Sequence, residues 1–153
     1  MKRTALLLAV MIAGSAAADT VPYPENFRLW SHVKSGVIGP QHKNFAMNGG
    51  LHHVYANKEA MVGYRTRQFP EASVIVFEWL EWVEKDGAFL EGPRRQVDVM
   101  VKDSKRYADT GGWGFQRFVK DTRELASAPT PQVCFACHNQ LKKDDLVLSK
   151  YRE

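Results

Sequence analysis

A run of β-branched and aromatic side chains at residues 73–84 (SVIVFEWLEWVE) most constrains the fold of this chain. Such a composition is typical of a strand, and the second half of the run alternates between two faces. Lys85-Asp86-Gly87 follows with the composition of a hairpin turn. Residues 96–102 (QVDVMVK) then alternate cleanly as a second strand. These two strands argue against a helical bundle.

The other segments predict shorter elements around this hairpin. Two more strands are expected at residues 51–56 and 113–118. Short helices are expected at residues 25–33, 57–64, 103–109 and 132–141, and Asn57 has the side chain of an N-cap. The sequence therefore predicts a single α+β domain, with a mainly antiparallel β-sheet and flanking short helices.

Composition excludes several classes of protein. Hydrophobic residues make up 44% of the 153 residues and charged residues 25%, which is the ordinary range of globular domains. The formal net charge of +4 is small and no cluster of Lys and Arg stands out, so nucleic acid is not an expected partner.

The first eighteen residues have the three parts of a secretory signal peptide. Met1-Lys2-Arg3 is basic, residues 4–13 are apolar, and residues 14–18 (GSAAA) are small. We expect cleavage after Ala18, which leaves residues 19–153 as the mature domain; an uncleaved anchor or a buried helix is the alternative. No later segment is apolar enough to span a membrane. The expected location is the periplasm if the source is a Gram-negative bacterium.

The strongest motif is Cys134-Phe135-Ala136-Cys137-His138, a C-x-x-C-H sequence. Each thiol can add across one heme vinyl group, and the adjacent histidine can then bind the iron. This spacing predicts one covalent heme c held by Cys134 and Cys137, with His138 as the metal ligand. A redox dithiol, a zinc site and a disulfide are the alternatives, but the βαβ setting and the second cysteine pair that the first two need are missing.

The position of the motif bears on the second axial ligand. Only fifteen residues follow His138, and none is a methionine. A second ligand would have to come from upstream, where Met47, Met61 and Met100 are available, although methionines more often fill gaps in cores. His52 and His53 are adjacent, so in a strand at most one of them can face the heme.

The chain resembles the cytochrome P-460 and cytochrome c′-beta superfamily across nearly all of its mature length. The residues that carry the resemblance are 55–57, 64–66, Phe69-Pro70, Glu91-Gly92, 100–103, the run TGGWGF at 110–115, and the terminal heme motif. The resemblance implies a heme packed against the sheet, a proximal histidine, an open distal face and often a homodimer. It also implies oxidation of hydroxylamine or binding of nitric oxide, with a periplasmic redox partner.

Two positions separate the branches of this superfamily. The P-460 branch links a lysine to the heme just before the Phe-Pro pair, where this chain has Gln68. Hydroxylamine-oxidising members place a carboxylate shortly before the heme motif, where residues 127–131 have none and Glu124 is the nearest. The resemblance therefore favours the c′-beta branch, whose distal pocket is apolar and lined by phenylalanine. Whether the chain is an enzyme stays open.

Four residues are the distal-pocket candidates that follow from this comparison. They are Gln68 at the lysine position, Phe69 and Phe45 as aromatic lids, and Arg65 as a partner for the heme propionates. The expected function is binding or redox processing of small nitrogen ligands, nitric oxide or hydroxylamine. A six-coordinate periplasmic electron carrier is the alternative, and an exported domain with a Cys134–Cys137 disulfide and no heme is a third.

Overall fold

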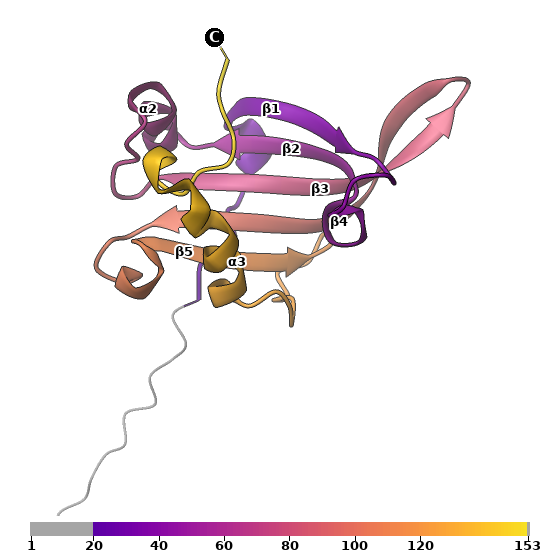
Figure 1. Ribbon diagram of the computed structural model, residues 1–153. Coiled ribbons are helices and arrows are strands. Elements are labelled where there is room, and N and C mark those ends of the chain that lie inside the picture. Colours follow the sequence, from indigo (N-terminus) through magenta and orange to yellow (C-terminus); the bar gives the residue numbers. More distant parts are fainter. Residues whose placement is uncertain (1–19, 153) are drawn as a thin grey trace, which may run out of the picture.

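The computed structural model describes residues 20–152, so the expected signal peptide lies outside the described residues. Five antiparallel strands form one sheet in sequence order, and each strand pairs with the next along the chain (Figure 1). Such a meander needs only hairpin and loop connections. The strands are β1 (Ser31–Ile38), β2 (Gly50–Ala56), β3 (Val74–Lys85), β4 (Ala88–Lys102) and β5 (Trp113–Val119).

The α-helices are short and lie in front of the sheet in Figure 1. They are α1 (Phe45–Asn48), α2 (Lys58–Thr66) and α3 (Pro131–His138). Asn57 caps α2, since its side chain accepts a hydrogen bond from the backbone N–H of Ala60 at 2.9 Å. The expectation of an α+β fold with a mainly antiparallel sheet is confirmed.

None of the helices within residues 20–152 is long and apolar enough to cross a membrane.

Each face of the sheet has its own hydrophobic core. On the helical face, Ala60 and Tyr64 of α2 pack with Ile75, Trp113 and Phe115 of the strands. On the opposite face, Val76, Val97 and Val99 pack with residues near the N-terminus, among them Val21 and Phe27. Because β3 and β4 are covered on both faces, the hydrophobic run at 73–84 is nearly continuous in its first half.

Two of the expected helices do not form. Residues 103–109 form turns that lead into a 3-10 helix at Ala108–Thr110. Residues 25–33 were expected to be helical, but only a 3-10 turn at Phe27–Leu29 forms and the chain then enters β1. The helical spacing of Phe27, Trp30 and Val33 does not decide the conformation, because Phe27 is buried in one core and Val33 in the other. Tertiary pairing with β2 therefore overrides a weak local pattern.

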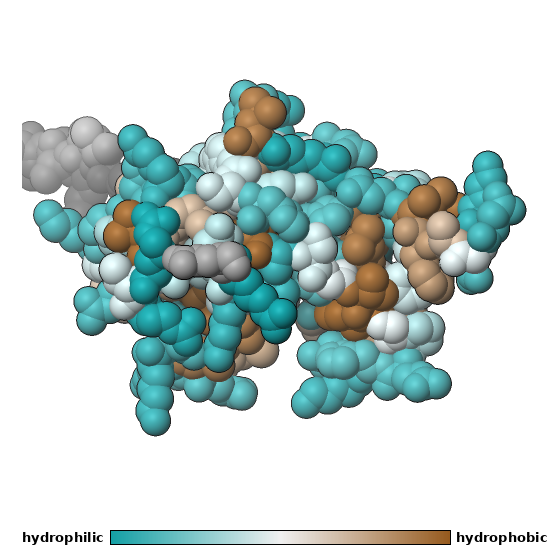
Figure 2. All heavy atoms as spheres, turned by 90° about the horizontal axis from the view of Figure 1, so that it is seen from above, coloured by the Kyte–Doolittle hydropathy of each residue, from teal (hydrophilic) through white to brown (hydrophobic). Residues whose placement is uncertain are grey.

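The β3–β4 hairpin extends well beyond the body of the sheet (Figure 1). It turns at Asp86 and Gly87, both with positive φ, as the Lys85-Asp86-Gly87 signal predicts. Hydrophobic side chains gather on this projection at the right of Figure 2.

Candidate heme site

A cavity of about 440 Å³ lies on the helical face of the sheet, between α3 and α1. Its volume is in the range of small-molecule and cofactor sites. The sheet contributes side chains that are mainly aromatic and aliphatic, joined by a few polar groups: His52, Phe77, Trp79, Asp98, Met100, Phe115 and Arg117. Residues in and next to the two helices close the sides: Asn44, Met47, Asn48, Pro129, Val133, Cys134, Cys137 and His138.

His138 is held at the end of α3 by two contacts. Its Nδ1 lies 2.7 Å from the carbonyl oxygen of Leu146, and its ring centroid lies 5.0 Å from that of Phe115 on β5. Since a carbonyl can only accept, Nδ1 carries the proton and Nε2 keeps its lone pair. Burial lowers the pKa of His138, which favours the neutral imidazole. A neutral ring oriented by a backbone carbonyl is the usual state of a metal-binding histidine.

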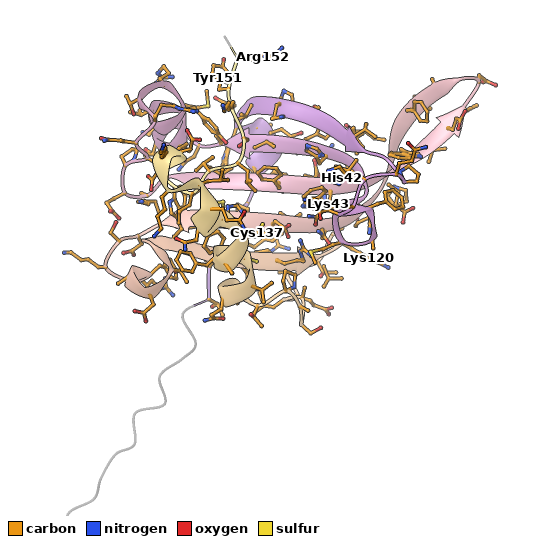
Figure 3. All side chains as sticks on the ribbon, viewed as in Figure 1. His42, Lys43, Lys120, Cys137, Tyr151 and Arg152 are labelled. Atoms are coloured by element: carbon orange, nitrogen blue, oxygen red, sulfur yellow. The ribbon has the colours of Figure 1, made fainter. Side chains whose placement is uncertain are left out.

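The two cysteines stand on the same helix as His138. Both thiols are free, Cys134 is half-buried, and Cys137 is exposed on α3 (Figure 3). Burial raises the pKa of the Cys134 thiol. One turn of helix brings Cys134, Cys137 and His138 to one wall of the cavity. The three side chains that the C-x-x-C-H motif singles out therefore border the same cavity.

The cavity also contains a carboxylate that the sequence comparison did not anticipate. Asp98 on β4 accepts hydrogen bonds from the indole N–H of Trp79 at 2.9 Å and from Arg117 at 2.6 and 2.7 Å. Both carboxylate oxygens are thus engaged. Asp98 is fixed in an ion pair with Arg117 and is poorly placed to take a proton from a ligand.

A comparison with protein families matches residues 24–149 to the family described as Cytochrome P460. The chain belongs to the cytochrome P460 family. The match covers the whole sheet and the C-x-x-C-H helix, and it identifies the chain as a heme-binding cytochrome. A comparison with curated proteins finds no match.

The four distal candidates suggested by the cytochrome P460 resemblance do not line the cavity. Gln68 and Arg65 are exposed at the end of α2. Phe69 is buried in the core, edge-on to Tyr64 and Trp113 at centroid distances of 5.1 and 5.6 Å. The physical reason is that α2 packs on the core: the side chains just after it either face solvent, as Gln68 does, or enter the core, as Phe69 does.

Phe45 is also placed elsewhere. The centroid of its ring lies 6.4 Å from that of Trp82, at the base of the β3–β4 hairpin. The Phe45 ring also covers Gly49, where a Cβ would collide with the ring. Its neighbours Asn44, Met47 and Asn48 line the cavity instead. An α-helix of one turn points successive side chains in different directions, so a sequence cannot show which member of such a turn faces a pocket.

Some of the other residues that the sequence singled out line the cavity and some do not, and for those on strands the face of the sheet decides. His52 lines it and His53 does not, so the alternation on β2 is confirmed. Phe77, Met47 and Met100 line it, whereas Met61 is buried in the core. The aromatic character expected of the pocket is present, but Phe77, Phe115 and Trp79 provide it.

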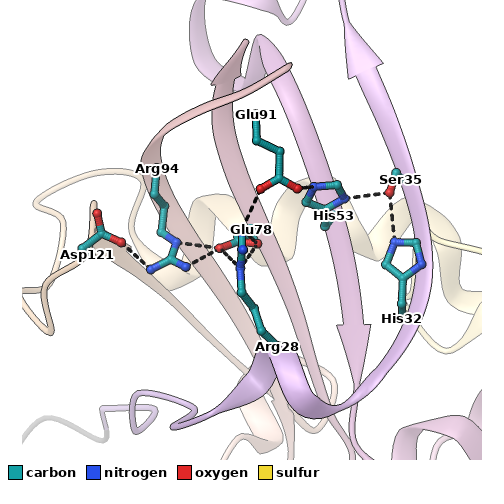
Figure 4. Close-up of polar contacts among 8 residues, drawn as sticks. All are labelled: Arg28, His32, Ser35, His53, Glu78, Glu91, Arg94 and Asp121. Carbon is teal, nitrogen blue, oxygen red and sulfur yellow. Dashed lines mark hydrogen bonds and ion pairs between the residues drawn. The ribbon is translucent and has the colours of Figure 1, made fainter. Parts of the chain in front are cut away.

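The opposite face of the sheet bears a polar network that the sequence did not reveal (Figure 4). Glu78 is fully buried there and accepts hydrogen bonds from Arg28 at 2.9 Å and from Arg94 at 2.7 Å. The network continues through Glu91 and His53 to Ser35 and His32, and from Arg94 to Asp121. Alternation along β3 provides a signal, since Glu78 lies between the cavity residues Phe77 and Trp79.

Proposed function

We propose that this member of the cytochrome P460 family is an exported c-type cytochrome that binds small nitrogen ligands at an open heme position. Nitric oxide and hydroxylamine are the ligands proposed. The observation that carries the proposal is the arrangement of His138, which presents Nε2 beside two free thiols on the wall of a mainly apolar cavity. Export to the periplasm is proposed from the N-terminal signal.

The residues of the cavity fit a covalently attached heme. Cys134 and Cys137 would form the two thioether links, and His138 would bind the iron as proximal ligand. Arg117 lines the cavity and is a cationic side chain that could pair with a heme propionate. Its hydrogen bonds to Asp98 already use much of its donor capacity. The bound heme would supply the iron that takes the ligand and exchanges electrons. The protein would orient it and exclude water.

The lining favours neutral ligands. Phe77, Phe115 and Met100 offer few polar groups to replace the water around an ion, so moving an ion into the cavity costs free energy. Nitric oxide is neutral and weakly hydrated, so its transfer from water costs almost nothing. Because Asp98 is committed to Arg117 and Trp79, we propose little turnover of hydroxylamine, which requires a base to remove protons.

The proposal is tested on the protein purified from the periplasm. We expect an intact mass larger than residues 19–153 by one heme, and we expect acid–acetone to leave the heme on the protein. His138→Ala should retain the covalent heme and lose the native spectrum. Heme that extracts into acid–acetone, or no heme, would overturn the assignment.

A six-coordinate electron carrier is the second candidate, because two methionine side chains line the cavity and either sulfur could bind the iron. Met47 on α1 and Met100 on β4 both line it. A low-spin ferrous spectrum that Met47→Ala or Met100→Ala converts to high-spin would favour this alternative. Met61→Ala is the control, since Met61 lies in the core outside the cavity.

A further inference from the structure

His52 brings an unused polar group to the cavity. Its Nδ1 is buried and has no hydrogen-bond partner within residues 20–152. Burial, with smaller contributions from Lys34 and His53, lowers its pKa, so the ring is neutral at pH 7 and has one N–H and one lone pair. Buried polar atoms are nearly always hydrogen-bonded in folded proteins. Asn48 Oδ1, from another cavity residue, is also without a partner within residues 20–152, so both side chains can offer a hydrogen bond to a bound group.

The ring packs against aromatic side chains and a glycine. Its centroid lies 5.1 Å from that of Trp79 and 6.1 Å from that of Phe77 on the neighbouring strand. On the other side it lies over Gly36, its pairing partner in β1. A Cβ at position 36 would be 2.7 Å from Cε1 of His52, so the absence of a side chain there makes room for the imidazole.

His52 on β2 and His138 at the end of α3 border the same cavity. The His138 ring packs on Phe115 of β5, and His52 belongs to β2, three strands away in the sheet order. A group bound to Nε2 of His138 would extend from the β5 side into the space that His52 borders. Phe77 and Met100, between them, offer no hydrogen-bond donor.

We propose that His52 is a specificity-determining residue that hydrogen-bonds to a ligand bound at the heme iron. This inference rests on the proposed function. In this mainly apolar cavity the imidazole would add a hydrogen bond to ligands that have N–H, O–H or a negative charge, such as hydroxylamine and azide, and so offset part of the cost of desolvating them. Nitric oxide is a poor hydrogen-bond acceptor, so His52 would add little to its affinity. His52 therefore sets the preference between nitric oxide and ligands that form a hydrogen bond.

The test compares ligand affinities of the heme-loaded protein with those of four variants. In His52→Leu we expect azide binding to ferric heme to weaken about 10- to 100-fold, the usual effect of losing a hydrogen bond to a charged group. Nitric oxide binding to ferrous heme should change by less than about threefold, as expected when no strong hydrogen bond is lost. The carbon–oxygen stretch of the ferrous carbonyl complex should rise in frequency. His52→Gln should restore part of both effects.

Gly36→Ala keeps the imidazole but forces it to move, so it should reproduce the loss of azide affinity. His53→Gln is the matched control on the opposite face and should leave both readouts at wild-type values. If nitric oxide still binds but His52→Leu leaves both the azide affinity and the carbonyl stretch unchanged, the role proposed for His52 is wrong and the proposed function stands. A wild-type protein that holds no heme, or holds heme that takes neither ligand, would overturn the proposed function and this inference together.

Discussion

Glu78 is a buried charge whose neutralisation depends on two arginines from distant parts of the sequence. Arg28 precedes the sheet and Arg94 lies on β4, and the side chain of Glu78 is fully inaccessible. Removing one member of a buried ion pair leaves the other charge uncompensated in a medium of low polarity.

We expect Glu78→Gln to lower the free energy of unfolding by about 3 kcal/mol, because Arg28 and Arg94 then lose their shared carboxylate. Urea denaturation of the heme-loaded protein measures it. Arg123→Ala is the control, since Arg123 forms an exposed pair with Glu25 and its loss should be undetectable. A Glu78→Gln protein as stable as the wild type would show that the network contributes nothing to folding.

The lowered pKa of His52 predicts a specific pH dependence of stability. Above about pH 6.5, the ordinary histidine pKa, the ring is neutral in both the folded and unfolded chains. As the pH falls below that value the unfolded chain takes up a proton first, so stability declines until the folded pKa is passed. Wild type should therefore lose more stability between pH 7 and pH 5 than His52→Gln. Equal slopes for wild type and His52→Gln would contradict the burial argument.

At the residue scale, a local motif groups the residues of one wall of the cavity, whereas no local pattern groups those of the other walls. Cys134, Cys137 and His138 lie within one turn of α3, so their spacing in the sequence is enough to bring them together. The rest of the lining comes from strands β2 to β5 and from α1, which pairing and packing bring together. Gln68 and Phe69 lie outside that lining, and Asp98, which belongs to it, gave no local signal.

At the scale of elements, a glycine within α2 fixes where the following loop packs. Phe69 lies directly over Gly63, and a methyl group at position 63 would overlap its ring. A glycine inside a helical pattern often marks such a close approach, and here it is the sequence feature that could have placed Phe69 in the core.

Gly63→Ala should lower the free energy of unfolding by about 1–3 kcal/mol, because overpacking moves Phe69 against Tyr64 and Trp113. Thermal or urea unfolding measures the change. Gly39→Ala is the matched control, since nothing lies within 4 Å of a Cβ at that position. Stabilisation by the better helix former at position 63 would mean that the core yields more easily than the contacts indicate.

The elements themselves were predicted well wherever a local signal agreed with the tertiary environment. Strand β3, the turn at Asp86-Gly87, the Asn57 cap and the helix at the heme motif all follow their sequence patterns. Strand β1 does not, because the apolar residues of the stretch 25–33 are divided between two cores and β1 depends on pairing with β2. Helical spacing over nine residues was too weak a signal to outweigh that pairing.

At the scale of the whole molecule, the projecting hairpin exposes apolar side chains. Val83, Phe89 and Leu90 are exposed to 46%, 65% and 47%. The family resemblance implies a homodimer, and we propose this hairpin as part of its interface.

If so, Phe89→Ser with Leu90→Ser should shift the sedimentation coefficient from that of a dimer to that of a monomer and leave the heme spectrum intact. Val62→Ser, at an exposed apolar position on α2, is the control and should stay dimeric. A dimer that survives the double substitution would place the interface elsewhere.

The central claim is that Cys134, Cys137 and His138 hold a heme whose iron keeps one position open toward the cavity. The most direct measurement is the absorption spectrum of the reduced protein, recorded before and after addition of nitric oxide. We predict a high-spin c-type spectrum that converts fully to a nitrosyl spectrum at stoichiometric nitric oxide. A low-spin spectrum that nitric oxide leaves unchanged would contradict the account and show that a protein side chain fills the sixth position.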